Sequence, residues 1–374
     1  MTILHFSDTH LGFQAFDIVN DEGVNAREQD VYFAFERVIH EILTKKPDLV
    51  IHSGDFFHRP SPSNRALTFG LEQLNRVSKA GIPVALIAGN HETPKTIYNS
   101  PILRALRSVD GVFPIFSDEW ESFSFGDVVV HGVPHINNPA RLNSELARME
   151  PVSGKFNILM LHTSLGRSYL MEEYGEQMFP EDFESKLAGF QYVALGHWHG
   201  RQKINLHPNA WYSGSTERFS DAEIDTVKGY LWLQVGQDLS CTVESHDIPT
   251  RPWLKWERSR CHEYSVSQLE AELTDFARNN DTRDAIVSIN FVDILTEQSL
   301  ELTNLKLREL FPDAFQILPK RKSWHLHTFI QEIDTGSFDR LDQIFSDYLK
   351  SKYPDTPETA SRLTELSKKY FPEF

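Results

Sequence analysis

The segment Ile3-Leu4-His5-Phe6-Ser7-Asp8-Thr9-His10 places a carboxylate and an imidazole directly after a short apolar run. A run of this length and composition predicts a β-strand. Loops at the carboxyl ends of strands build many of the binding sites in α/β folds, so Asp8 and His10 are candidate metal ligands. The same arrangement recurs along the chain and decides the expected fold.

Four further apolar runs are each followed by side chains that can bind a metal. They are Leu49–Ile51 before Gly54-Asp55, Val84–Ile87 before Gly89-Asn90-His91, Ile158–Leu161 before His162, and Tyr192–Leu195 before Gly196-His197-Trp198-His199. If the five runs are neighbouring strands of one sandwich, seven oxygen and nitrogen donors meet at one rim. That number suffices for two divalent ions about 3.5–4 Å apart, the arrangement used for phosphate ester hydrolysis.

The order D-x-H, G-D, G-N-H, H and G-H-x-H resembles the calcineurin-like metallophosphoesterase family over roughly residues 1–235. Within the family, the sequence is most similar to the nuclease subunit of DNA double-strand-break repair complexes, the bacterial SbcD type with its archaeal and eukaryotic relatives. Three details favour this branch: Gly54–His58, Tyr212–Phe219 and the tail after Gly336. Thr9, Glu92 and Trp198 depart from commoner family residues, but none is an expected ligand, so the expected chemistry is unaffected.

The resemblance implies a dinuclear metal centre bridged by Asp55, whose carboxylate can contact two ions where a single imidazole cannot. One ion would also take Asp8, His10 and His199, and the other would take Asn90, His162 and His197. A strand at residues 197–199 would point both imidazoles to one side, whereas a turn could divide them between the ions. Hard oxygen and nitrogen donors without a thiolate favour Mn²⁺, Fe²⁺, Mg²⁺ or Zn²⁺. The family points to manganese.

Two further histidines are expected to act in catalysis. The resemblance makes His91 the proton donor to the leaving 3′-oxygen, and an imidazole titrates close enough to neutrality for that role. It assigns His58 to positioning the scissile phosphate or strand, with an ordinary surface-loop residue as the alternative. Arg218 could contact a phosphate or hold the loop that carries His199. His325-Leu326-His327 has ligand-like spacing, but alternation along a strand explains it better.

The expected fold class is α/β, a metallophosphoesterase β-sandwich flanked by helices, with a small α+β capping domain and a C-terminal helical tail. Apolar spacing predicts amphipathic helices at 27–45 and 64–78, and residues 123–130 read as a hairpin. A Pro-rich boundary at 248–252 separates the nuclease domain (1–248) from the capping domain (249–330) and the tail (331–374). In the capping domain, strands are expected at 253–256, 286–292 and 315–318, and helices at 267–278 and 297–310.

Composition bounds the function. The formal net charge of −16 argues against bulk attraction to nucleic acid, so DNA must be bound through a local surface, the metal ions or a partner. Lys320–Trp324 combines basic charge with an aromatic ring, although a solvated turn is an equal alternative. Two cysteines without a CxxC motif favour free thiols, and no apolar run approaches a membrane span. A cytoplasmic protein without a cleaved leader is therefore expected.

The resemblance implies a Mn²⁺-dependent DNA nuclease with double-strand exonuclease and single-strand or hairpin endonuclease activity. The resemblance adds an SMC-type ATPase partner (SbcC-like), docked on the helices of 331–374, although that apolar stripe could instead pack on its own chain. Since the sequence has no GxxxxGK[ST] loop, ATP hydrolysis would belong to the partner. A homodimer through 64–78 or 100–108 is expected by analogy. The alternatives are a phosphodiesterase for a small substrate, such as a cyclic nucleotide or nucleotide-sugar, and a non-catalytic scaffold.

Overall fold

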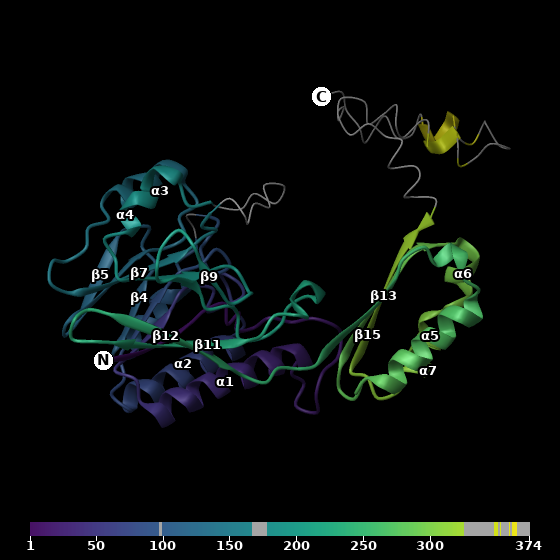
Figure 1. Ribbon diagram of the computed structural model, residues 1–374, viewed down its shortest axis with the longest axis horizontal. Coiled ribbons are helices and arrows are strands. Elements are labelled where there is room, and N and C mark those ends of the chain that lie inside the picture. Colours follow the sequence, from purple (N-terminus) through teal and green to yellow (C-terminus); the bar gives the residue numbers. More distant parts are fainter. Residues whose placement is uncertain are drawn as a thin grey trace. The chain divides into compact units, whose positions relative to one another are not determined.

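The computed structural model describes residues 1–96, 99–166 and 178–324, together with short helical pieces at 348–350, 352, 359 and 361–364. The chain divides into two compact units, which are described separately (Figure 1). The first comprises Met1–Leu254 with Asp284–Ile286, and the second comprises Lys255–Arg283 with Val287–Phe374. The predicted tail helices fall almost wholly outside the described residues, as does His325-Leu326-His327.

The first unit contains two six-stranded sheets. The first sheet has the order β12-β11-β1-β2-β3-β4, and the second has the order β5-β6-β7-β8-β10-β9. Strands of the first sheet are β1 (Thr2–Phe6), β2 (Leu49–His52), β3 (Val84–Ile87), β4 (Val112–Ile115), β11 (Gly229–Val235) and β12 (Cys241–Asp247). Strands of the second are β5 (Glu121–Phe125), β6 (Val128–Val133), β7 (Phe156–His162), β8 (Tyr192–Gly196), β9 (Gln202–Ile204) and β10 (Ala210–Tyr212). The predicted hairpin is the antiparallel pair β5–β6.

The two sheets pack face to face, as the sandwich prediction requires. β1 to β4 run parallel, and so do β6, β7, β8 and β10. Apolar side chains from both sheets share one buried cluster, for example Ile51 and Ile87 from the first with Ile158 and Met160 from the second. Strands buried on both faces read as continuous apolar runs, and this explains why sequence alone located the five strands beside the polar clusters.

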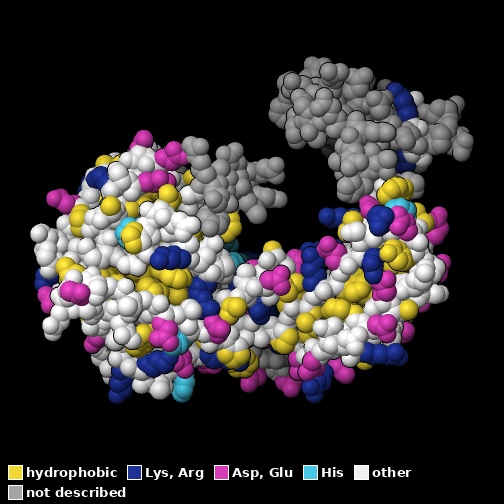
Figure 2. All heavy atoms as spheres, in the orientation of Figure 1, with side chains coloured by type: hydrophobic (Ala, Val, Ile, Leu, Met, Phe, Trp, Pro, Cys, Tyr) yellow, Lys and Arg dark blue, Asp and Glu magenta, His cyan; other side chains and the backbone are white. Residues whose placement is uncertain are grey.

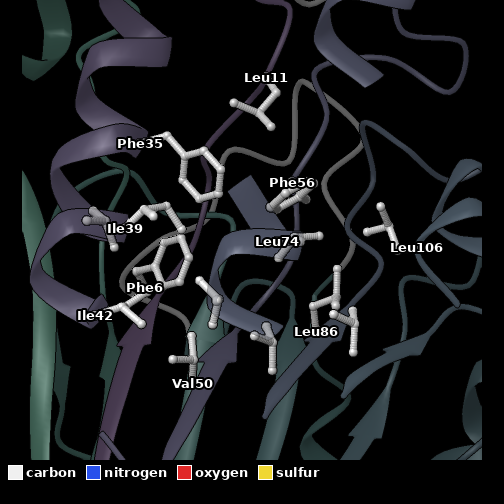
Figure 3. Close-up of a cluster of buried hydrophobic side chains, with 14 of the residues drawn as sticks. Phe6, Leu11, Phe35, Ile39, Ile42, Val50, Phe56, Leu74, Leu86 and Leu106 are labelled. Carbon is white, nitrogen blue, oxygen red and sulfur yellow. The ribbon is translucent and has the colours of Figure 1, made fainter. Parts of the chain in front are cut away.

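Helices cover the outer faces of the sandwich (Figure 1). α1 (Ala26–Lys45) and α2 (Asn64–Lys79) pack on the first sheet, where Phe35 and Leu74 meet Phe6 and Val50 (Figure 3). α3 (Pro139–Ala147) and α4 (Glu184–Leu187) cover the second sheet. Short 3₁₀ helices of the first unit lie at Ile102–Ser108 (η1), Glu181–Phe183 (η4) and Asp221–Glu223 (η5), and another in the second unit lies at Cys261–Glu263 (η6). The predicted α/β sandwich flanked by helices is confirmed.

The second unit is built around the sheet β13-β14-β15. Its elements are α5 (Val266–Asn279), α6 (Thr296–Glu301), α7 (Asn304–Leu310), β15 (Gln316–Ser323) and most of β13 (Trp253–Arg258) and β14 (Ile286–Ile294), whose first residues belong to the first unit. The prediction of a single helix at 297–310 is wrong, because α6 ends before Leu302 and a second helix, α7, begins at Asn304. Thr303 caps the second helix by accepting a hydrogen bond from Lys306 N at 3.2 Å. Within the described ranges, no helix is both long and apolar enough to cross a membrane.

Candidate metal centre

The seven predicted ligands converge at one rim of the sandwich. Each follows or ends a parallel strand, with Asp8 after β1, Asp55 after β2 and Asn90 after β3 on the first sheet. His162 ends β7, and His197 and His199 follow β8 on the second sheet. Because the ligands come from both sheets, the centre depends on the sheets being packed against each other.

The loops that carry the ligands adopt unusual backbone conformations. Asp8, His10, Asp55 and His197 have φ angles of 51°, 49°, 56° and 99°. Residues with a Cβ pay on the order of 1–3 kcal/mol for such conformations, and they persist mainly where function requires them. Gly89 is needed for a different reason, because a Cβ there would lie 2.2 Å from Asp55 Oδ1. The packing of the surrounding sandwich must therefore offset the cost of these backbone conformations.

On one side of the centre, His162 and Asn90 lie against Asp55. The His162 Nε2 atom is 3.2 Å from Asp55 Oδ2 and 3.1 Å from Asn90 Oδ1. His197 Nδ1 is 3.3 Å from the same Asn90 oxygen. These are the donors that the family resemblance assigns to the second ion.

On the other side, His10 Nε2 lies 3.2 Å from His199 Nε2 and 3.7 Å from Asp55 Oδ2. Asp8, His10 and His199 each offer a ligand atom within 4.8 Å of the others. Asp8 also groups with Asp55 and His162 in the same way. Since His197 and His199 face opposite sides, the segment after β8 is a turn that divides the two imidazoles.

The donor set fits divalent metal ions. Bonds of about 2.1 Å to one ion place neighbouring ligand atoms about 3.0–3.4 Å apart in octahedral or tetrahedral geometry, close to the separations observed. Burial lowers the pKa of His197 to about 3 and the pKa of His10 well below its usual value, so both imidazoles are neutral, as metal binding requires. His10 Nε2 and His199 Nε2 face each other at 3.2 Å, the spacing of two nitrogen ligands on one ion.

The electrostatics of the centre also favour a cation. Burial opposes charge on His162, but Asp55 and Asp8 outweigh it and raise the pKa of His162 to about 9. Burial raises the pKa of Asp8, whereas His162 and its neighbours hold the pKa of Asp55 well below the usual range despite its burial. A site that places positive charge on a buried imidazole would stabilise a dication in the same position.

His91 and His58 lie beside His10. The His91 Nδ1 atom donates to the His58 carbonyl oxygen at 3.1 Å, and the backbone N–H of His91 donates to Asp55 Oδ1 at 2.9 Å. The ring centroids of His10 and His91 are 4.6 Å apart. His58 Nδ1 is 3.4 Å from His10 Nδ1, and burial lowers the pKa of His58 to about 4. Both histidines singled out from sequence thus border the centre.

The sequence of this fold matches a known protein family. Residues 1–201, more than half of the chain, match the calcineurin-like phosphoesterase family. The chain belongs to this family.

Similar proteins from archaea carry a more specific name. The chain is 33% identical to the DNA double-strand break repair protein Mre11 of Sulfurisphaera tokodaii, over 66% of this chain and 61% of that protein. The protein of the same name from Sulfolobus acidocaldarius is 32% identical, over 64% and 62%. The one from Methanococcus maripaludis is 30% identical, over 72% and 74%. The chain thus spans about three fifths of the length of the first two relatives.

Three residues hold the loops of the candidate metal centre, although the sequence analysis gave them no role there. Glu92 is 1% exposed, and its carboxylate accepts from Gly89 N at 3.1 Å and Phe57 N at 2.8 Å. It thereby ties the loop after β3 to the loop after β2. Glu223 contacts His199, and Lys228 contacts Glu223. No motif spacing marks these residues, since their partners lie on other segments.

Arg218 uses its guanidinium within the protein. Its nitrogens donate to the carbonyl oxygens of Glu223 and Thr226 and to the Thr250 hydroxyl. Of its two predicted roles, these contacts favour holding the loop over contacting a phosphate.

Proposed function

We propose that the protein is a Mn²⁺-dependent DNA nuclease that hydrolyses phosphodiesters at a dinuclear site. The observation that carries this proposal is the position of Asp55 Oδ2, near His162 Nε2 on one side and His10 Nε2 on the other. A carboxylate between two groups of oxygen and nitrogen donors suits a bridge between two ions. The similarity to proteins named for DNA double-strand break repair supports DNA as the substrate.

The residues that would hold the metal ions are the seven converging side chains. Asp55 would bridge, Asp8, His10 and His199 would complete one site, and Asn90, His162 and His197 would complete the other. Two bound dications would supply an activated water and charge neutralisation for in-line attack on phosphorus. Hard oxygen and nitrogen donors suit manganese.

His91 is oriented to act as the proton donor. Because its Nδ1 donates to the carbonyl oxygen of His58, the exchangeable proton of the charged ring is the one on Nε2. The hydrogen bond from its backbone N–H to Asp55 holds the backbone of His91 beside the proposed bridging ligand. His91 therefore protonates the leaving 3′-oxygen. His58, which lies against both His10 and His91, positions the scissile phosphate or strand.

The remaining parts of the proposal concern the whole protein. Residues 249–330 form a capping domain that contacts DNA, and residues 331–374 dock on an SMC-type ATPase (SbcC-like). The protein acts in the cytoplasm as a homodimer, with exonuclease activity on double-stranded ends and endonuclease activity on single strands and hairpins. With a net charge of −16, the chain is expected to rely on the metal ions and the partner for much of its hold on DNA.

The test is cleavage of a labelled hairpin duplex with Mn²⁺, with and without chelator. His91→Ala should lower the cleavage rate by about 10²–10⁴-fold, the usual contribution of a general acid, while Mn²⁺ binding is retained. His40→Ala, an exposed histidine on α1, is the matched control and should cleave normally. Hydrolysis of a simple aryl phosphodiester with no cleavage of any DNA would instead support a small-substrate phosphodiesterase.

A further inference from the structure

Of the two imidazoles proposed for the first ion site (Asp8, His10 and His199 with Asp55), His199 is the more exposed, and a neighbour outside the seven proposed ligands contacts it. Its side chain is 26% exposed, whereas that of His10 is 2% exposed. Packing alone therefore holds the His199 ring less firmly. Glu223 of η5 supplies the missing constraint, because its Oε1 lies 3.1 Å from His199 Nδ1.

This contact selects the tautomer of His199. A carboxylate is only an acceptor, so Nδ1 must carry the proton, and Nε2 keeps its lone pair. The Nε2 atom is the one that lies 3.2 Å from His10 Nε2, on the side of the metal centre. Ligating histidines commonly donate their second nitrogen to a carboxylate, which fixes the ring and makes it a stronger ligand.

Lys228 holds the carboxylate in turn. Its side chain is 0% exposed, and its ammonium has three donors for three acceptors. These are Glu223 Oε2 at 2.6 Å, Ser215 Oγ at 2.9 Å and the carbonyl oxygen of His199 at 2.9 Å. Lys228 thus fixes both the carboxylate and the backbone of the histidine that the carboxylate orients.

We propose that Glu223, held by Lys228, is a positioning residue that presents His199 Nε2 to the first metal ion. The inference rests on the proposed function in that it takes the seven side chains as a metal centre. Glu223 is not one of the seven proposed ligands. It acts by keeping the proton of His199 on Nδ1.

Replacing the carboxylate with an amide separates this role from simple support of the fold. In Glu223→Gln, the Lys228 ammonium, 2.6 Å from Oε2, competes for the amide oxygen with Phe219 N and Ser220 Oγ, each 3.3 Å from Oε1. The shorter, charged contact prevails, so the amide oxygen turns toward Lys228 and the amide NH₂ faces His199 Nδ1. That nitrogen must then accept, and the proton moves to Nε2, where it blocks the metal. Removing the ammonium in Glu223→Gln/Lys228→Met frees the amide oxygen to accept from Nδ1 again. The double variant should therefore bind metal better than the single variant.

The experiment is calorimetric titration of Mn²⁺ into the full-length, metal-free chain. Glu223→Gln should weaken one of two sites by about 10–100-fold, the usual effect of losing such a partner. The double variant should recover at least half of that loss on a logarithmic scale. Glu145→Gln is the matched control, because Glu145 is 1% exposed and paired with Arg141 and Arg148 away from the ligands; its Mn²⁺ affinity should equal that of the wild type.

Unchanged affinity in Glu223→Gln, or a double variant that binds more weakly than the single variant, would overturn the inference. Nitrogen-15 spectra of the metal-free chain give a second readout: His199 should carry its proton on Nδ1 in the wild type and on Nε2 in Glu223→Gln. Failure of the proposed function is distinguishable, because it would appear as a wild-type chain that binds two Mn²⁺ ions without cleaving DNA.

Discussion

His5 is a buried histidine that the metal centre does not use. It lies on β1 between the two sheets, with Nδ1 2.9 Å from the Tyr192 hydroxyl and Nε2 2.8 Å from the Ser53 hydroxyl. Burial lowers its pKa to about 3. Two neutral hydroxyl partners satisfy the neutral ring but give little support to a charged one. His5 therefore makes the fold sensitive to acid.

The sign of this effect follows from linkage. The folded pKa of His5 is below the unfolded value of 6.5, so the unfolded chain binds the extra proton as the pH falls below 6.5. Stability is thus full above pH 6.5 and is lost toward pH 3. Between pH 7.5 and pH 5, His5 should remove about 2 kcal/mol from the free energy of unfolding. A glutamine at this position, in His5→Gln, can still bond to the two hydroxyl groups but does not titrate. Between pH 7.5 and pH 5 the variant should therefore lose about 2 kcal/mol less unfolding free energy than the wild type, as measured by urea denaturation of metal-free protein. His40→Gln should keep the wild-type pH dependence.

Glu92 offers a second prediction at this scale. Glu92→Gln replaces one of the two oxygens that accept from Gly89 N and Phe57 N with an amide NH₂. One buried backbone donor then has no acceptor, which should lower the free energy of unfolding by about 1–3 kcal/mol. Urea denaturation measures the loss, and Glu72→Gln on the exposed side of α2 should show none. Equal stability of both variants would mean that Glu92 does not hold the two loops.

At the level of elements, local patterns in the sequence predicted most of the helices and strands that surround the candidate metal centre. The strand before each ligand and the helices α1 and α2 were located to within a few residues, because apolar runs and helical spacing are local signals. The break between α6 and α7 was missed, since a Thr cap inside a helical pattern competes with periodicity. Sheet order and the contacts of Glu223 depend on segments far apart in the chain, which no local pattern encodes.

α1 begins at a cap that also holds the preceding loop. The Asn25 side chain accepts from Arg27 N at 3.0 Å and donates to the Phe16 carbonyl at 2.7 Å. Asn25→Ala should therefore lower the free energy of unfolding by about 1–2 kcal/mol, near the upper end for a cap. Asn25→Asp keeps the acceptor and should lose less. Thermal or urea unfolding measures both, and a loss equal in the two variants would argue against the capping role.

Over the whole molecule, net charge bears on the proposed DNA substrate. Figure 2 shows acidic and basic side chains interspersed on the visible face of the described residues. With a net charge of −16, the isolated chain should make few phosphate contacts. Its affinity for duplex DNA should fall by about 10-fold or less between 50 and 200 mM salt, whereas six to ten contacts would cost about 10³–10⁵-fold. Fluorescence anisotropy across a salt series measures the slope, and a loss near 10³-fold would reveal a basic surface.

Metal binding should stabilise the two units unequally. All seven proposed ligands lie in the first unit. Free Mn²⁺ at about 100 times its Kd should add about 2.7 kcal/mol to the stability of the state that binds it. Calorimetric scans with and without chelator should therefore move the unfolding transition of the first unit and leave that of the second in place. A common shift of both transitions would contradict this assignment.

The order in which the ligands occur along the chain has a consequence for biosynthesis. Asp8 leaves the ribosome first, His197 and His199 come almost two hundred residues later, and Lys228 follows them. The second sheet contributes His162 and the last pair, so an unfinished chain that has folded only its first βαβ half lacks three of the seven donors. With the seven proposed ligands as the metal centre, hydrolysis should therefore appear only after most of the first unit has been translated. A truncated chain released before that point would lack part of the proposed metal centre and should hydrolyse no phosphodiester.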